Sequence, residues 1–257
     1  MSRFRVLQFN MQFGQIWDDA DPDHAPIDLE ATLTEIRRHD ADVILLQEVE
    51  HAQAGGMQLQ PPPNYTRLRA ELTGYESCFA YPKADVRELP FGIGLAIFSR
   101  GPIRDPMRLD LPSPPIEFDF YGNKTTPTDR LLIGAKTTFH GREIQLYNTH
   151  LLAFFMLGSG KNESPWQRNL VADQITGATA PTILTGDFNE HRHEILINHF
   201  AQAGFRTAQQ TDITWRRRPL VLDHVFYNAP LRVVGSQVFP SPASDHHALV
   251  VDFEFVH

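Results

Sequence analysis

The sequence predicts an α/β fold in which two mixed β-sheets pack against each other and the helices lie outside. Several candidate strands are continuous runs of valine, isoleucine and leucine, which are typical of strands covered on both faces. Candidate helices are interspersed among them without strict alternation, which argues against a barrel of βα units. No repeat, low-complexity tract or linker divides the chain, so we expect a single domain over residues 1–257.

Ten segments have the pattern of strands, with apolar runs or alternation bounded by turn residues. In chain order they are Arg3–Asn10, Val43–Glu48, Tyr75–Ala80, Gly92–Ser99, Leu131–Phe139, Ile144–His150, Thr182–Asp187, Val221–Tyr227, Leu231–Phe239 and Ala248–Phe255.

Four segments fit helices. In the first of them Leu29, Leu33 and Ile36 recur at helical spacing. Two proline-rich stretches, Gln60–Asn64 and Pro102–Pro127, are expected to be long surface loops. The candidate helices are Leu29–His39, Tyr65–Leu72, Pro165–Thr176 and Glu194–Ala203.

Composition limits the class of protein. With 257 residues, 42% of them hydrophobic, the chain can bury a large core. Its net charge of −8 disfavours a protein that binds long nucleic acids through nonspecific phosphate contacts, although a local basic patch would suffice. The lone Cys78 excludes an intramolecular disulfide and is expected to pack as a small apolar residue. No apolar run reaches a membrane span and no signal core is evident, so a soluble cytoplasmic protein is expected.

The most informative polar residues are Asp187 and Asn189, which follow a buried-strand pattern. They lie two residues apart, so in an extended chain they point to the same face. A carboxylate can hold or deprotonate a water molecule, and a neighbouring amide can orient that water or an oxyanion. By itself the pair is equally consistent with an Asx turn at the end of a strand.

Other candidate strands also place polar residues where apolar or turn residues are expected. Asp223 is the most telling, because a buried unpaired carboxylate is costly and needs a partner such as a histidine. Ligand sites of α/β proteins collect at strand ends, so all these residues together indicate one site. Besides Asp223, the residues concerned are Asn10, Glu48, Asn148, His150, Asp245 and His246.

In order and in motif, these residues resemble the endonuclease/exonuclease/phosphatase superfamily of metal-dependent phosphoesterases, over nearly the whole chain. The resemblance implies a four-layer α/β sandwich, with two mixed sheets face to face, helices outside and the site at one edge. The matching pieces are Phe9-Asn10, Leu46-Gln47-Glu48, Asn148-Thr149-His150, Gly186-Asp187-Phe188-Asn189, Leu222-Asp223-His224 and Ser244-Asp245-His246.

The resemblance also implies a metal site. Glu48 would be the main ligand of Mg²⁺, for which Mn²⁺ would substitute, with Asn10 beside it and Asp245 completing the site. Carboxylate and amide oxygens suit these ions. Gln12 stands where some nuclease relatives carry a carboxylate, which favours one metal ion over two.

The catalytic roles follow from the same resemblance. Asp187 would orient or deprotonate the attacking water with the help of Asn189. His246 would contact the scissile phosphate. The sequence leaves open whether Asp187 or His246 takes the proton. Three further residues complete the set: Asp223 would accept the other ring proton of His246, and His150 and Asn148 would hydrogen-bond the phosphoryl oxygens.

The predicted function is a Mg²⁺-dependent phosphoester hydrolase, a phosphodiesterase rather than a monoesterase. Its substrate is either a nucleic acid or a phospholipid-like or small diester, and no obligate protein partner is indicated. Arg130, Trp215 and Arg216 are candidates for holding a phosphate or stacking a base. The apolar segment Leu151–Leu157 is either a core strand extension or an exposed rim that favours a lipid-like leaving group. The alternative is a catalytically silent binding module on the same fold.

Overall fold

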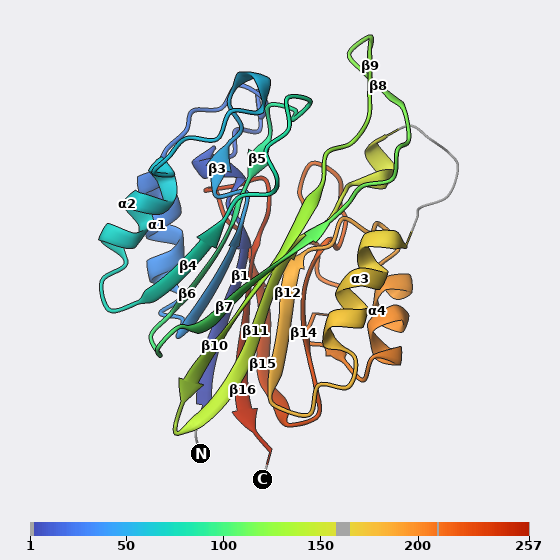
Figure 1. The fold of residues 1–257 in the computed structure, drawn as a ribbon. Coiled ribbons are helices and arrows are strands. Elements are labelled where there is room, and N and C mark those ends of the chain that lie inside the picture. Colours follow the sequence, from blue (N-terminus) through green and yellow to red (C-terminus); the bar gives the residue numbers. More distant parts are fainter. Residues whose placement is uncertain (1–2, 158–164, 210, 257) are drawn as a thin grey trace.

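Two six-stranded β-sheets pack face to face in the computed structural model, which describes residues 3–157, 165–209 and 211–256 (Figure 1). The first sheet has the spatial order β15 (Leu231–Phe239), β16 (Ala248–Phe255), β1 (Arg3–Asn10), β2 (Val43–Gln47), β6 (Leu95–Ser99) and β4 (Glu76–Ala80). The second has the order β13 (Arg206–Thr207), β14 (Asp223–Tyr227), β12 (Thr182–Asp187), β11 (Arg142–His150), β10 (Arg130–Phe139) and β7 (Arg104–Leu111). The pairs β1–β2 and β11–β12 are parallel and their neighbours antiparallel, so both sheets are mixed, as predicted.

Helices cover the outer faces and complete four layers (Figure 1). On the first sheet α1 (Leu29–Arg38) and α2 (Pro63–Glu71) share a core with β1, β2 and β6. On the second, α3 (Trp166–Ile175) and α4 (His193–Gln202) pack in the same way. A third core lies between the sheets and holds side chains from both. The predicted sandwich is confirmed, and none of these helices is long and apolar enough to cross a membrane.

The start of α1 shows how local sequence sets an element. Asp28 precedes the helix, and its carboxylate accepts hydrogen bonds from the amides of Glu30 and Ala31. Such a cap satisfies amides that have no partner inside the helix. Leu33 and Ile36 are buried against the first sheet, so the helical period read from the sequence is the one that packs.

The prediction of a long loop over Pro102–Pro127 was wrong. It contains the edge strand β7 and a hairpin formed by β8 (Phe118–Phe120) and β9 (Asn123–Thr125). Pro106 lies inside β7, and it is tolerated because β7 pairs only with β10 among the described strands and the register shifts between Gly134 and Lys136. The proline that indicated a loop therefore marks an edge strand.

One predicted strand is divided. Within Gly92–Ser99 the chain turns at Gly94, whose φ of +85° favours glycine and whose added Cβ would lie 2.8 Å from the Phe79 ring. The first part, β5 (Gly92–Ile93), pairs with β3 (Glu50–His51), which follows β2. This small pair lies at the carboxyl ends of β1, β2, β11 and β12, the end away from both chain termini in Figure 1.

The apolar segment Leu151–Leu157 is not a core strand extension. The strand β11 ends at His150, and the next two residues, Leu151 and Leu152, are buried. Phe154–Met156 then form one turn of 3₁₀-helix, with the Met156 side chain exposed.

Candidate active site

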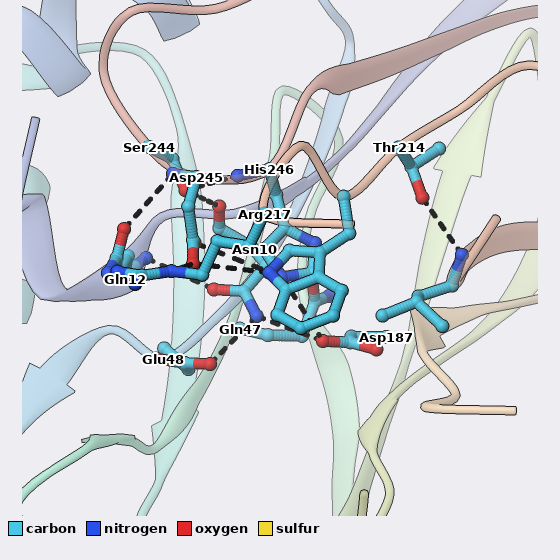
Figure 2. A network of polar contacts seen from close by, with 12 residues as sticks. Asn10, Gln12, Gln47, Glu48, Asp187, Thr214, Arg217, Ser244, Asp245 and His246 are labelled. Atoms are coloured by element: carbon cyan, nitrogen blue, oxygen red, sulfur yellow. Dashed lines mark hydrogen bonds and ion pairs between the residues drawn. The ribbon is translucent and has the colours of Figure 1, made fainter. Parts of the chain in front are cut away.

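Four strand ends bring polar side chains from both sheets together. Asn10 and Glu48 come from the ends of β1 and β2, and His150 and Asp187 end β11 and β12. Ligand atoms of Glu48, His150 and Asp187 all lie within 4.8 Å of one another. Asn10 bridges the sheets, because its Nδ2 donates to Glu48 Oε1 at 2.9 Å and to Asp187 Oδ2 at 3.1 Å (Figure 2). The four strand-end residues singled out in the sequence therefore meet at one place.

The backbone at Glu48 is unusual. Its φ is +50°, a left-handed conformation that residues other than glycine rarely adopt and that often marks a functional position. The side chain lies against Gly92, where an added Cβ would be 2.3 Å from both Cβ and Oε2 of Glu48. Gly92 was not among the predicted site residues. It is a glycine in the strand pattern Gly92–Ser99, and such a glycine can mark a close approach of another group.

Asp223, His246 and Asp187 form a line of polar groups. His246 Nδ1 lies 2.7 Å from Asp223 Oδ2, and its Nε2 lies 3.6 Å from Asp187 Oδ2. All three side chains are buried. Burial by itself lowers the pKa of His246, but the nearby Asp223 and Asp187 carboxylates outweigh it and raise that pKa. The imidazolium therefore presents one N–H to each carboxylate.

The carboxylates at the site repel one another. Burial, together with the charge of Asp245, raises the pKa of Glu48 to about 7. Burial also raises the pKa of Asp187, with Asp223 and Glu48 adding to the effect and His246 opposing it. Crowded hard oxygen donors of this kind are suited to a divalent cation, which would neutralise them.

The pKa of His150 is shifted in the opposite direction to that of the two carboxyl groups. Its Nε2 lies 3.6 Å from Asp187 Oδ2 and 3.9 Å from Glu48 Oε1. Burial, and then the positive charges of Arg130 and His246, lower its pKa well below the usual range. The ring is therefore neutral, and its Nε2 is placed between the two carboxylates.

Asn148 is placed differently from expectation. Its two amide hydrogens are donated to the carbonyls of Leu46 and Ala96, at 2.9 and 3.0 Å, and its Oδ1 accepts from Gln47 Nε2 at 2.6 Å. The residue is fully buried. With its hydrogens engaged in this way, Asn148 joins the two sheets, and we correct its expected contact with a phosphoryl oxygen to a bracing role.

A buried glutamine chain continues from Asn148 to Asp223. Gln8 donates to Gln47 Oε1 and to Asp223 Oδ1, both at 2.8 Å, and both glutamines are fully buried. These hydrogen-bonded glutamines hold Asp223 in place behind the imidazole. Gln8 was not among the predicted site residues. Its position two residues before Asn10, and so on the same face of β1, was the available signal.

Asp245 is held from three directions. Its Oδ2 accepts from Trp215 Nε1 at 3.2 Å and from Arg217 Nε at 2.5 Å, and its amide donates to Gln12 Oε1 at 3.0 Å (Figure 2). Its Oδ1 faces the site, 4.0 Å from His246 Nε2. Gln12 therefore supports the backbone at the site instead of adding a carboxylate.

The three substrate-binding candidates have different surroundings. Trp215 is buried and its Nε1 donates to Asp245. The Arg216 guanidinium lies over the ring of Trp17, 5.1 Å from its centroid. The arginine that pairs with Asp245 is Arg217. Arg217 was missed, and nothing in a run of three arginines distinguishes its middle member. Arg130 begins β10, and its Nε is buried without a hydrogen-bond partner among the described residues.

Asn189 stands beside Asp187 as the sequence suggested. Its backbone amide donates to Asp187 Oδ1 at 3.0 Å, and its side chain donates to the carbonyl of Leu151 at 2.9 Å. Its φ is +49°. The turn therefore fixes the direction of the Asp187 carboxylate.

Comparison with known proteins adds the following. A family model described as the "Endonuclease/Exonuclease/phosphatase family" matches residues 7–246. A UPF0294 protein of Yersinia pseudotuberculosis is 33% identical over 118 residues, 44% of this chain and 44% of that protein, so the match spans less than half of this curated relative.

Solved structures resemble the whole sandwich. A structure described as an endonuclease/exonuclease/phosphatase from Beutenbergia cavernae has a TM-score of 0.73 at 20% identity, covering 99% of this chain and 72% of that chain. D. rerio TDP2 complexed with a single-strand DNA product has a TM-score of 0.67 at 19% identity, covering 99% and 100%. At such identities the likeness shows a shared fold.

Proposed function

The chain belongs to the endonuclease/exonuclease/phosphatase family, and from that premise we propose that its site hydrolyses a phosphodiester with one divalent cation. One observation carries the proposal: ligand atoms of Glu48, His150 and Asp187 lie within 4.8 Å of one another, at the ends of strands from two sheets. Ligand atoms of Asp187, Asp223 and His246 also lie within 4.8 Å of one another. Carboxylates, an imidazolium and a neutral imidazole in one place can orient a water molecule and stabilise charge on a phosphoryl group.

The donor set fits Mg²⁺ or Mn²⁺. Glu48 offers a carboxylate, and Asp245 Oδ1 faces the same space while its Oδ2 is held by Arg217. Asn10 turns its amide nitrogen, not its oxygen, toward Glu48, so we assign it to bridging the sheets. When bound, the cation would neutralise charge on the phosphoryl oxygens.

The remaining residues handle water and charge. Asp187 accepts a hydrogen bond from the attacking water and takes its proton, since its carboxylate is fixed by Asn189 and burial raises its pKa. His246 donates Nε2–H toward the phosphoryl group while Asp223 holds Nδ1–H. Arg130, whose Nε has no partner among the described residues, donates to another phosphoryl oxygen.

A soluble diester tests this function. Bis-p-nitrophenyl phosphate should be hydrolysed with Mg²⁺ or Mn²⁺, faster than p-nitrophenyl phosphate, and EDTA should abolish the reaction. Asp187→Asn and His246→Ala should each lower kcat by ~10²-fold or more. If the diester is not cleaved with either metal while both ions bind, the protein is a silent binding module and the proposal is wrong.

A further inference from the structure

Exposed apolar side chains gather in three loops. The loops are residues 52–62, 81–91 and 112–129, which we call the apolar cap; the last includes the β8–β9 hairpin. Among the described residues the cap exposes Tyr121 by 89%, Val86 by 82%, Met57 by 57%, Phe91 by 48% and Leu59 by 39%. Soluble proteins rarely expose apolar side chains in contiguous groups without a binding role.

The first two loops hold each other. Gln58 Nε2 donates to the carbonyl of Pro82 at 2.9 Å, and the Tyr81 hydroxyl donates to the carbonyl of Leu59 at 3.2 Å. At Gly56 an added Cβ would overlap a backbone carbonyl of the second loop, so the two backbones are in contact. The exposed side chains of these two loops therefore project from one connected piece of backbone.

The third loop is attached to the second. Thr128 Oγ1 donates to Glu88 Oε2 at 2.7 Å, and the rings of Phe91 and Phe120 meet edge to face with centroids 5.8 Å apart. Phe120 in turn contacts the exposed Tyr121 ring, at 4.8 Å between centroids. The cap is thus one surface built from three parts of the sequence.

This surface adjoins the candidate active site. Phe91 directly precedes Gly92, which packs against the Glu48 side chain. His51 Nε2 lies 3.2 Å from the carbonyl of Pro90, which ties the second loop to the segment that follows Glu48. In Figure 1 the β8–β9 hairpin projects from the same end of the sandwich as β3 and β5.

The charges of the cap do not suit a polyanion. Arg87 is paired with Asp85, and Lys124 is paired with Glu117 at 3.1 Å. Acidic residues of the cap outnumber basic ones by five to three, the remaining charged residues being Lys83, Glu88, Asp119 and Asp129. Nucleic acids are held mainly by basic side chains on phosphates, and three of the five exposed apolar residues of the cap are aliphatic and cannot stack on bases. An uncharged or zwitterionic apolar surface is the better match.

We propose that the apolar cap docks the protein onto a phospholipid surface and that the substrate is the phosphodiester of a zwitterionic lipid. This deepens the proposed function and rests on it. Aromatic and aliphatic side chains insert at the headgroup level of a bilayer, which is the expected place for Tyr121 and Val86. In the reaction the water oxygen bonds to phosphorus as its proton passes to Asp187, the ester P–O bond breaks, and the released alcohol oxygen takes the proton of His246 Nε2.

Flotation of the full chain with phosphatidylcholine vesicles tests the docking. Both cap residues Val86 and Tyr121 are exposed, so the double variant Val86→Ser/Tyr121→Ser should fold. It should bind vesicles at least ~10-fold more weakly than the unaltered chain, because two inserted apolar groups are lost. Val234→Ser, an exposed apolar position on β15 outside the cap, is the matched control and should bind normally. Vesicles enriched in phosphatidylglycerol should not bind more tightly, since the cap has no excess of basic groups.

Binding and catalysis can fail separately. In both variants kcat/KM for soluble bis-p-nitrophenyl phosphate should equal that of the unaltered chain. Absence of vesicle binding, with the soluble diester still hydrolysed, overturns the docking and leaves the proposed function intact. If the protein binds vesicles but does not hydrolyse the soluble diester, the docking stands and the proposed function is wrong. If the double variant instead loses binding of a fluorescent single-stranded oligonucleotide, or loses self-association, the cap serves that partner and the lipid proposal is wrong.

Discussion

His246 is held by Asp223 through a 2.7 Å contact between Nδ1 and Oδ2, and the other oxygen of Asp223 accepts from Gln8 at 2.8 Å. The carboxylate therefore has a partner on each oxygen although it is fully buried. A buried carboxylate arranged in this way fixes the imidazole ring and keeps its second nitrogen aimed at Asp187, 3.6 Å away.

Asp223→Asn tests that relationship. The amide keeps the size of the side chain and the bond from Gln8, but it removes the charge that stabilises the imidazolium. We expect kcat for bis-p-nitrophenyl phosphate to fall on the order of 10²–10⁴-fold, as when the carboxylate behind a catalytic histidine is neutralised. Asp252→Asn, which alters a surface partner of Arg5, is the control and should leave kcat unchanged. A rate near that of the unaltered chain would remove Asp223 from the mechanism.

Glu48→Gln tests the metal site. The amide is a weaker ligand than the carboxylate, so the Mg²⁺ concentration that gives half-maximal activity should rise at least ~10-fold. A Mg²⁺ titration of the initial rate measures this. Glu143→Gln, at a half-exposed position on β11, should not change the titration. Equal titrations for both variants would place the metal elsewhere.

Gly92→Ala tests the close packing behind Glu48. The added methyl group would lie 2.3 Å from Glu48 Oε2, so the carboxylate must move. The variant should need more Mg²⁺ in the same assay, while circular dichroism stays that of the unaltered chain. At Gly235 an added Cβ meets only ordinary contacts, with 3.4 Å to the nearest atom, so Gly235→Ala should behave normally. An unaltered Mg²⁺ titration for Gly92→Ala would mean that Glu48 does not depend on this packing.

The sequence predicted the sandwich and the residues at strand ends, because burial pattern and polar interruptions are local signals. Asp187 and Asn189 stood out within five consecutive residues, but it was the polar residues at the other strand ends that favoured a site over an Asx turn. Arg217 could not be recognised, since its role depends on Asp245, 28 residues away in the chain. The position of Gln8 on the face of Asn10 was a signal, but its partner Asp223 lies 215 residues away. Pro106 misled for a similar reason: whether proline breaks a strand depends on whether that strand is at an edge.

Asn148→Ala tests the reassigned role of this residue. Truncation removes the side-chain hydrogen bonds to the carbonyls of Leu46 and Ala96, and it removes one of the two hydrogen bonds that the Gln47 amide donates. The free energy of unfolding should fall by about 2–5 kcal/mol, as for loss of a buried hydrogen-bond network. Urea denaturation measures this, with Asn123→Ala on the exposed β9 as the control. Unchanged stability together with a raised KM would instead favour a direct contact with the substrate.

Cys78 should be a slow thiol. It is partly buried in β4, and burial raises the pKa of its thiol to about 11 against an ordinary value of about 9. Only the thiolate reacts with disulfide reagents, so at pH 8 modification by dithiobis(nitrobenzoate) should be ~100-fold slower than in the chain unfolded in guanidinium chloride. Because the folded pKa is the higher one, the rate for the folded protein should keep rising about tenfold per pH unit beyond pH 9, where that of the unfolded chain levels off. A rate that levels off near pH 9 in the folded protein would show that strand β4 leaves the thiol in water.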